Sequence, residues 1–241
     1  MKRLALMLLF VLILVFSAQA CGLKSVRGSG NVVEQERQVS GFNEIKLSDQ
    51  GTVYVEFGDS EALLIEAEDN LLEYLESEVE GDTLKIGVKE RVNLRPKEPI
   101  NFYVTLKKLD ALDISGSGKM QVPEISVTSF SIDISGSGDV DMTALYAASL
   151  DVEISGSGKV DIEGGEVEDQ DIDISGSGRY NARDVQSGRT KIEVSGSGEA
   201  TVRVRDHLEV DVSGSGDVRY LGAPTVDEDV SGSGDVEHIG E

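Results

Sequence analysis

An acidic residue recurs at a fixed place in this sequence, two positions before each of seven Ser-Gly-Ser-Gly motifs. The seven acids are Asp113, Asp133, Glu153, Asp173, Glu193, Asp211 and Asp229. Carboxylate oxygens are the ligands that Ca²⁺ prefers in proteins. The pattern therefore predicts either a calcium-binding ladder or a plain solvated line of like charges that uses no cofactor.

The serines of the motif are the second group that could carry chemistry. A serine becomes a nucleophile when an adjacent base, such as histidine, accepts its proton. The sequence contains 2 histidines, His207 and His238, and neither stands in a nucleophile–base–acid pattern. Because the same serines recur in every repeat, we predict that they are structural and that the chain has no catalytic residue.

The motif also sets the period of the chain. It begins at Ser115, Ser135, Ser155, Ser175, Ser195, Ser213 and Ser231. The first five copies are spaced by 20 residues, and each of the last two steps is 18 residues. A fixed period of this size is typical of stacked repeats that each contact their neighbours.

Apolar residues occupy the same columns in each repeat. In the first complete repeat they are Met120, Val122, Ile125, Val127, Phe130, Ile132 and Ile134. They form three runs of alternating apolar and polar residues, which indicates three short strands with bends between them. Later repeats place Gln170, Ser187 and Thr190 in these columns, so we expect a thinner core there. We predict an all-β fold, a parallel β-helix with three short strands per coil.

The glycines of the motif are predicted to form the corners of this β-helix. They are Gly116, Gly118, Gly136, Gly138, Gly156, Gly158, Gly176, Gly178, Gly196 and Gly198. A corner needs backbone angles that residues with a Cβ avoid, and glycine adopts positive φ without steric cost. The serines between them are expected to hydrogen-bond to turn amides or to the serine of the next coil.

We predict one domain over residues 31–241, with regular repeats in residues 111–241 and an irregular N-terminal cap in residues 31–110. Residues 48–51 are a degenerate copy of the motif and residues 27–30 a near-copy, so the repeat is expected to begin before its clean copies. Stacked repeats need such caps because the end coils have only one neighbour.

One short helix is predicted within the cap, over residues 69–75. Asp69 or Asn70 would accept hydrogen bonds from the first turn, and three leucines would share one face. At the other end of the chain, the last motif begins an incomplete coil. An open edge there is a site at which a homo-oligomer could pair.

The N-terminus has the features of an export signal over residues 1–20. Lys2 and Arg3 precede an apolar run that is too short to span a bilayer comfortably, and small residues stand at Ala18 and Ala20. The signal predicts an exported protein of the cell envelope.

Cleavage after this signal would leave Cys21 as the first residue. Its place resembles that of the lipid-modified cysteine of bacterial lipoproteins, so we predict lipid attachment at Cys21 and membrane anchoring through a tether of residues 21–30. The alternative is cleavage by ordinary signal peptidase, which would release a soluble secreted or periplasmic protein.

The charge of the chain restricts its partners. It has 45 acidic and 22 basic residues and a formal net charge of -23. A chain this acidic is repelled by nucleic acid and by anionic headgroups. We expect no nucleic-acid partner and a surface ligand that is a protein or a glycan.

Four segments resemble a known bacterial family, the putative auto-transporter adhesin, head GIN domain. They are Gly28-Ser29-Gly30-Asn31-Val32, Phe42-Asn43-Glu44-Ile45, Asp69-Asn70-Leu71-Leu72 followed by Leu84-Lys85-Ile86, and the stretch over residues 109–118. The resemblance implies a right-handed β-helix on exported, often lipid-anchored envelope proteins, and it brings no catalytic residues. Residues 107–109 depart from the family, where a proline often precedes the leucine.

Two classes of function follow from the sequence. The first is a non-enzymatic envelope protein, a putative adhesin that presents a rigid acidic β-helix for binding. The second is a polysaccharide-active β-helix enzyme, a lyase or hydrolase, since the same architecture hosts both. The clean repeats carry no long insertion and the chain has no Trp, which favours the first class.

Overall fold

The computed structural model describes residues 24–241, so the expected signal sequence and Cys21 lie outside the described residues. The strands are β1 (Lys24–Arg27), β2 (Val32–Arg37), β3 (Glu44–Asp49), β4 (Thr52–Phe57), β5 (Ala62–Glu68), β6 (Leu75–Glu80), β7 (Thr83–Val88), β8 (Val92–Arg95), β9 (Asn101–Leu106), β10 (Ala111–Gly116), β11 (Lys119–Val122), β12 (Ile125–Gly136), β13 (Asp139–Met142), β14 (Leu145–Gly156), β15 (Lys159–Ile162), β16 (Gly165–Gly176), β17 (Arg179–Gly196), β18 (Glu199–Gly214), β19 (Asp217–Leu221), β20 (Thr225–Gly232) and β21 (Asp235–Gly240). A single 3-10 turn, η1 (Leu72–Tyr74), interrupts them within residues 24–241.

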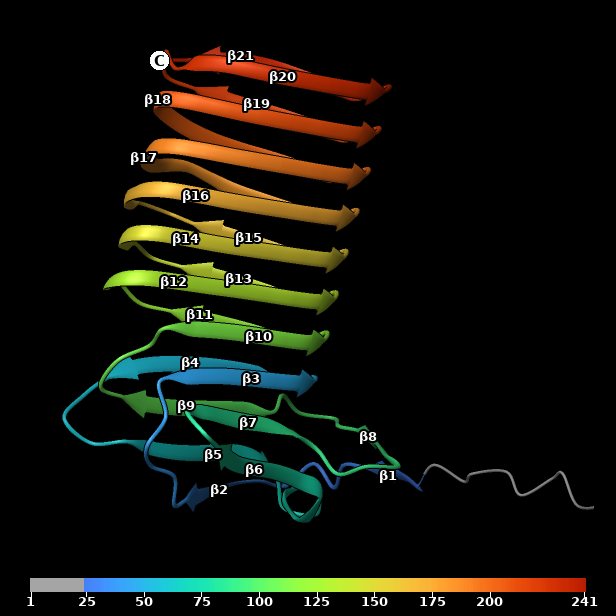
Figure 1. Cartoon of the computed structure of the whole chain (residues 1–241). Helices are drawn as coiled ribbons and strands as arrows, with labels where there is room; N and C mark the ends of the chain where they lie inside the picture. Colours follow the sequence, from blue (N-terminus) through green and yellow to red (C-terminus); the bar gives the residue numbers. More distant parts are fainter. Residues whose placement is uncertain (1–23) are drawn as a thin grey trace, which may run out of the picture.

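Strands β10 to β21 stack as the parallel β-helix that the sequence predicts (Figure 1). Each coil repeats the register of the one before it, so that Ile114 pairs with Ile134 and Ile134 with Ile154. The long strands β12, β14 and β16 run along the front in Figure 1, the short strands β13 and β15 return behind them, and the column rises with a right-handed turn.

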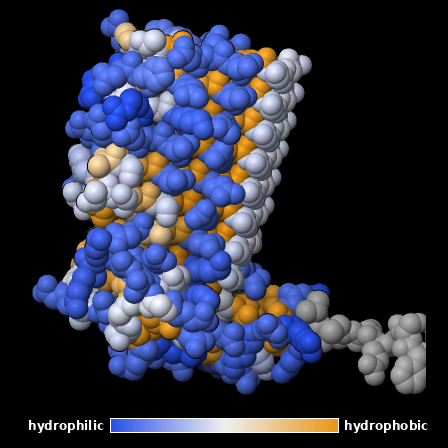
Figure 2. All heavy atoms as spheres, in the orientation of Figure 1, coloured by the Kyte–Doolittle hydropathy of each residue, from blue (hydrophilic) through white to orange (hydrophobic). Residues whose placement is uncertain are grey.

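The three predicted runs per coil are present, but the last two merge into one long strand. Strand β12 pairs with β14 through Val127 and again from Ser129, and the pairing skips Thr128. The chain bends at this position. Over the long strands, Figure 2 shows hydrophilic columns alternating with narrow hydrophobic stripes, bordered by a pale column where the strands end.

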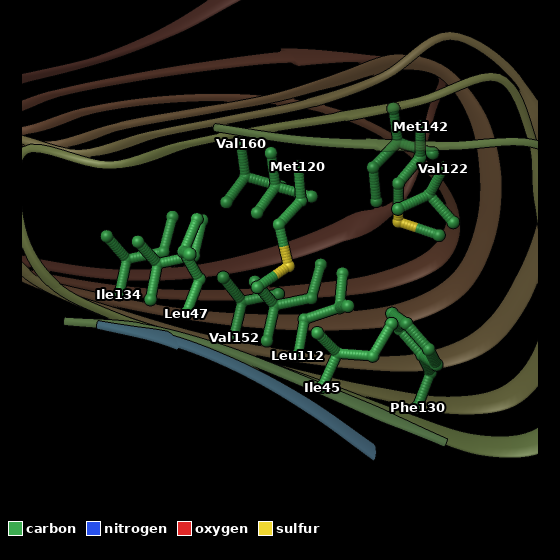
Figure 3. Packing of buried hydrophobic residues seen from close by; sticks show 14 of the residues in the cluster. Ile45, Leu47, Leu112, Met120, Val122, Phe130, Ile134, Met142, Val152 and Val160 are labelled. Atoms are coloured by element: carbon green, nitrogen blue, oxygen red, sulfur yellow. The ribbon is translucent and has the colours of Figure 1, made fainter. Parts of the chain in front are cut away.

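The core lies inside the column, where two walls of apolar side chains face each other (Figure 3). Leu112 on β10 and Val152 on β14 project toward Met120 and Val160 on the short strands β11 and β15, and all four are at most 1% exposed. Full burial of such a side chain contributes roughly 1.5–3 kcal/mol. No coil buries its apolar residues alone, so stacking stabilises the fold.

The weaker side of the core falls where the sequence predicts it. Gln170, Ser187 and Thr190 are buried polar residues among the apolar columns. Ser187 and Thr190 share a hydrogen bond of 2.7 Å between their hydroxyls, and the hydroxyl of fully buried Tyr180 donates one of 2.7 Å to Gln170. The polar groups are therefore largely paired inside the column.

Strands β3 and β4 extend the column below the clean repeats. In β3, Ser48 aligns with Ser115, and Asp49 aligns with Gly116. Asp49 has a positive φ of 91°, the same unusual backbone region that the corner glycine adopts. The degenerate motif at residues 48–51 is thus a true corner, as predicted.

The base of the column departs from the regular repeats but is an ordered sheet. Strands β7 and β9 continue the parallel stack beneath β3 and β4. Antiparallel pairings β2–β5, β5–β9 and β6–β7 then close the end. This change to antiparallel order covers the lower edge of the core.

The predicted helix over residues 69–75 shrinks to the turn η1. Its N-cap is Leu71, without a side-chain capping bond, because Asp69 and Asn70 are used elsewhere. The Asp69 carboxylate accepts a 2.5 Å hydrogen bond from the Ser29 hydroxyl, and the Asn70 amide donates to the Arg27 carbonyl at 2.9 Å. Competing contacts with a distant segment replace the expected caps.

The segment over residues 24–30 belongs to the fold, which corrects its prediction as part of the tether and as a near-copy of the repeat. Strand β1 pairs in parallel with β8. Gly28 packs so closely on fully buried Glu68 that a Cβ would lie 1.8 Å from its Oε2. Glu68 also accepts a 2.8 Å hydrogen bond from the Lys97 amide and one from the Gly30 amide. We call this arrangement the N-terminal clasp.

Within the part of the chain that the structure describes, no helix is both long and apolar enough to cross a bilayer.

Candidate functional site

The seven predicted acids form one outward-facing column, here called the acidic ladder. Parallel register pairs Asp113 with Asp133, Asp133 with Glu153, and Glu193 with Asp211. Neighbours in a parallel sheet are separated by about 4.8 Å, so two unit charges there repel by about 1 kcal/mol in water. The ladder lies on the face seen in Figure 2.

Burial and this repulsion raise the pKa values of two ladder carboxyls. Partial burial, followed by the charges of Glu153, Asp113 and Asp151, raises the pKa of Asp133 above its usual value. Burial and the charge of Glu193 likewise raise the pKa of Asp173. Asp133 and Asp173 therefore hold their protons more tightly than isolated carboxyls do.

Basic residues pair with two of the seven ladder acids among the described residues. Lys46 forms an ion pair of 2.5 Å with Asp113 next to the base, and Lys191 forms one of 2.5 Å with Glu193 farther up. Between these pairs, within residues 24–241, Asp133, Glu153 and Asp173 have no cationic partner within 4.0 Å.

The ladder carboxylates stand in single file. Over residues 24–241, no three His, Cys, Asp or Glu side chains converge on a point where a metal ion would bind. The arrangement of the carboxylates therefore identifies no calcium site among the described residues, and calcium binding is a question for experiment.

The two glycines of each motif serve different purposes, which sequence reasoning did not separate. The first has positive φ, as at Gly116 (132°) and Gly136 (124°), and bends the chain. The second is needed for close packing, because a Cβ on Gly138 would lie 2.4 Å from the Ile114 side chain. All ten predicted glycines follow this alternation in the described corners.

Backbone groups hold the corners together. The Ser137 amide donates to the Gly116 carbonyl at 2.7 Å, and the same bond recurs one coil later. The Ser115 hydroxyl instead bonds to Asp113 at 3.3 Å. Among the described residues no hydroxyl ladder joins the corner serines, so that prediction is wrong, and the corner serines are structural through their backbone.

Three cavities adjoin on the outer face of the long strands, and sequence reasoning missed them. One of about 340 Å³ shares Ala111 and Ser131 with a second of about 560 Å³. The second shares Ser149 and Asp151 with a third of about 350 Å³. Together they form a continuous depression from β7 to β18, which we call the flank furrow. The feature of the sequence that could have indicated the furrow is the run of polar residues beside each bend.

The lining of the flank furrow changes along the column. Ser129 and Ser149 share a 2.9 Å hydrogen bond between hydroxyls. Higher up, the Arg189 guanidinium makes two hydrogen bonds to the Asp169 carboxylate, at 2.7 and 2.8 Å. Asp171 has no ion pair within the described part of the chain. The furrow can therefore offer hydroxyls and free carboxylates in its middle.

Comparisons with known proteins agree with this architecture. A sequence profile of the family described as putative auto-transporter adhesin, head GIN domain, matches residues 41–224. No curated protein matches this chain.

Several crystal structures share the fold. A putative adhesin from Bacteroides fragilis has a TM-score of 0.82 at 21% identity, covering 89% of this chain and 100% of that one. A putative adhesin from Parabacteroides distasonis has a TM-score of 0.71 at 26% identity, covering 90% and 100%. A putative lipid binding protein from the same organism has a TM-score of 0.70 at 26% identity, covering 89% and 100%.

Proposed function

Because this chain belongs to the family of putative auto-transporter adhesins with a head GIN domain, we propose that it is a non-enzymatic adhesin of the cell envelope, anchored by lipid at Cys21. The observation that carries the proposal is the direction in which the chain runs along the column. Its N-terminal strand β1 lies at the base, and the coils rise away from it to the C-terminus (Figure 1).

This direction suits a protein that displays a binding surface above a membrane. A lipid on Cys21 would attach only a few residues before β1 and the N-terminal clasp, which fixes that end to the base. The six steps between the seven motifs then raise the column by about 29 Å at about 4.8 Å per coil. Two or three acyl chains hold a protein stably to a membrane, whereas one binds marginally.

The anchor is tested in cells that express the full chain. Radiolabelled palmitate should enter the protein, globomycin should cause the unprocessed form to accumulate, and Cys21→Ser should abolish labelling. Surface proteolysis of intact cells then distinguishes an outward-facing column from one that faces the periplasm. Unlabelled, freely secreted protein would contradict the anchor and favour ordinary signal cleavage.

Binding is tested separately with the mature protein on a glycan array and on immobilised envelope proteins, scored for both retention and cleavage. The proposal expects retention without product. Support for binding over catalysis comes from the repetition, because the same serines and acids recur in every coil, whereas an active site needs a unique constellation. Release of oligosaccharide from any polymer would favour the polysaccharide-active alternative.

A further inference from the structure

The base of the column carries a group of basic side chains that lack acidic partners. Strands β1 and β8 form a two-stranded sheet of their own, and Figure 1 shows it beside the base. Six exposed basic residues stand on these strands and at their ends, and we call them the basal patch: Lys24, Arg27, Lys89, Arg91, Arg95 and Lys97. Among the described residues, none of the six has a carboxylate within 4.0 Å.

Basic residues higher on the column are mostly neutralised. Along β11 to β19 most of them form ion pairs within a coil or between coils, as Arg179 does with Glu199 at 3.1 Å. Around the basal patch, Glu90 is the one acid in residues 89–97, and β1 contains none. The charge of Glu73 also acts on Lys24. The base is therefore locally positive, although the whole chain has a net charge of -23.

Two arginines of the basal patch stand side by side. Arg27 on β1 aligns in register with Arg95 on β8, and neighbouring strands are about 4.8 Å apart. Because Val26 and Leu94 pack inward, the next residue on each strand faces solvent. Like charges directly opposite each other destabilise a sheet. A pair that costs stability and has no counter-ion in the described chain points to an anion supplied from outside.

The place of the basal patch in the chain indicates the source of that anion. Lys24 is the third residue after Cys21, and a chain extends by at most about 3.6 Å per residue, or about 11 Å over this stretch. A lipid on Cys21 would therefore bring the basal patch to within about one Debye length of the headgroups, which is about 8–10 Å. Anionic headgroups attract basic residues over this distance. The acidic ladder rises away from the base, so salt screens most of its repulsion.

We propose that the basal patch is a docking surface for anionic phospholipid headgroups and holds the base of the column against the membrane. The inference rests on the proposed lipid anchor at Cys21 and adds to it, because the lipid tethers the chain whereas the basal patch determines which end faces the bilayer. Arginine is suited to this contact, since its guanidinium binds phosphate with two hydrogen bonds. The N-terminal clasp fixes the patch in place, and Nζ of Lys97 donates a 3.1 Å hydrogen bond to the Ser29 carbonyl.

Partitioning of a singly acylated mature chain onto lipid vesicles tests this proposal. The chain has 1 cysteine, Cys21, so a maleimide that carries one acyl chain attaches there. One acyl chain binds a bilayer only marginally, which leaves a second contribution measurable. We expect at least about tenfold tighter binding to vesicles with about one third phosphatidylglycerol than to pure phosphatidylcholine. Rising salt should reduce this gain, because it screens the charges.

A matched pair of double variants locates the contact. Arg27→Gln with Arg95→Gln should weaken binding to the anionic vesicles by about tenfold or more and leave binding to neutral vesicles unchanged. It should not lower the thermal midpoint, because it removes a like-charge pair. Arg183→Gln with Arg203→Gln is the control, at two arginines on β17 and β18 that also lack an ion pair among the described residues. Its effect on binding should be less than about threefold.

A second variant of the basal patch guards against misfolding. Lys89→Gln with Arg91→Asn removes two charges at the other end of the sheet, and Asn tolerates the positive φ of 62° at position 91. It should weaken binding to the anionic vesicles to a similar extent. Circular dichroism establishes that each variant is folded.

Three outcomes would overturn the proposal: equal or tighter binding to the neutral vesicles, equal losses in the patch and control variants, or calorimetric binding of inorganic phosphate that the patch variants abolish. The last would identify a site for soluble phosphate. Because the acyl chain is attached chemically, these results do not depend on lipidation in cells. Protein that takes up no palmitate in cells would contradict the anchor, whereas loss of the anionic preference would contradict the basal patch and leave the anchor standing.

Discussion

The Tyr180 hydroxyl donates a 2.7 Å hydrogen bond to Oε1 of Gln170 inside the column, between side chains that are both buried. Burial raises the pKa of the Tyr180 hydroxyl, so it remains a protonated donor. In the column of Gln170, Leu150 occupies the preceding coil. The column turns polar at Gln170 and continues with Thr190 in the next coil, and Nε2 of Gln170 has no partner among the described residues.

We expect Tyr180→Phe to lower the free energy of unfolding by about 1–3 kcal/mol, because it leaves Oε1 of Gln170 buried and unpaired. Adding Gln170→Leu to this variant should restore most of the loss, since it removes both remaining polar groups and restores the residue type found at position 150. Urea denaturation of the single and double variants measures the difference. A double variant less stable than Tyr180→Phe would contradict the role assigned to the pair.

Glu68 in the N-terminal clasp makes stability depend on pH. Burial alone raises the pKa of its carboxyl, but hydrogen bonds from the backbone amides of Lys97, Gly30 and Glu98 outweigh burial and lower the pKa below its usual value. A lowered folded-state pKa contributes stability that is present above the unfolded value of about 4.3. That stability is lost as pH falls through the folded-state value.

We therefore expect Glu68→Gln to lower the thermal midpoint at neutral pH, with the gap to the unmodified protein narrowing below about pH 4.3. The Gln side chain keeps one acceptor oxygen and brings an NH₂ group against backbone amides that also donate. Glu34→Gln, at an exposed position on β2, is the control and should leave the profile nearly unchanged. A constant gap at all pH values would show that the charge of Glu68 is not responsible.

Replacement of a corner glycine should destabilise the fold through the backbone, whereas replacement of the serine beside it should not. Gly136→Ala places a Cβ 2.6 Å from the Gly116 carbonyl at a φ of 124°, so we expect a loss above about 1 kcal/mol. Ser137→Ala alters an exposed side chain between the two glycines and should change stability by less than about 0.5 kcal/mol. Guanidinium denaturation provides both values, and similar losses would refute a backbone cause.

The last coil carries an acid at a core position. Glu228 on β20 pairs with Val210 on β18, whose side chain is buried, and inward charges on an edge strand oppose pairing with further strands. Glu228→Val should therefore increase self-association in sedimentation velocity runs. Asp227→Val, with the same charge change at an outward position, should not. Equal behaviour of the two variants would exclude this role for Glu228.

Calcium should leave the fold unchanged, because the acidic ladder presents its carboxylates in single file. We expect equal thermal midpoints in EDTA and in millimolar calcium, with magnesium as the control for general screening. A midpoint that rises with calcium alone, as ligand linkage requires, would establish a cation site on the ladder.

The sequence by itself determined the column. Its period, the alternation of residues such as Ile132 and Ile134, and the glycine corners are local patterns that repeat, and strands with one apolar face have few ways to stack in register. The outward ladder follows from the same alternation, since an acid between two buried residues must face solvent.

Tertiary structure decided the base of the column and the flank furrow. Ser29 and Asp69 are 40 residues apart in sequence, and their contact removes the cap on which the predicted helix depended. The segment over residues 27–30 resembles the repeat motif, but it forms the N-terminal clasp. The cause is again a contact with a distant residue, because the space beside Glu68 admits only glycine at position 28. The furrow depends on how far each strand bends at Thr128 and its equivalents, and packing between coils sets that bend.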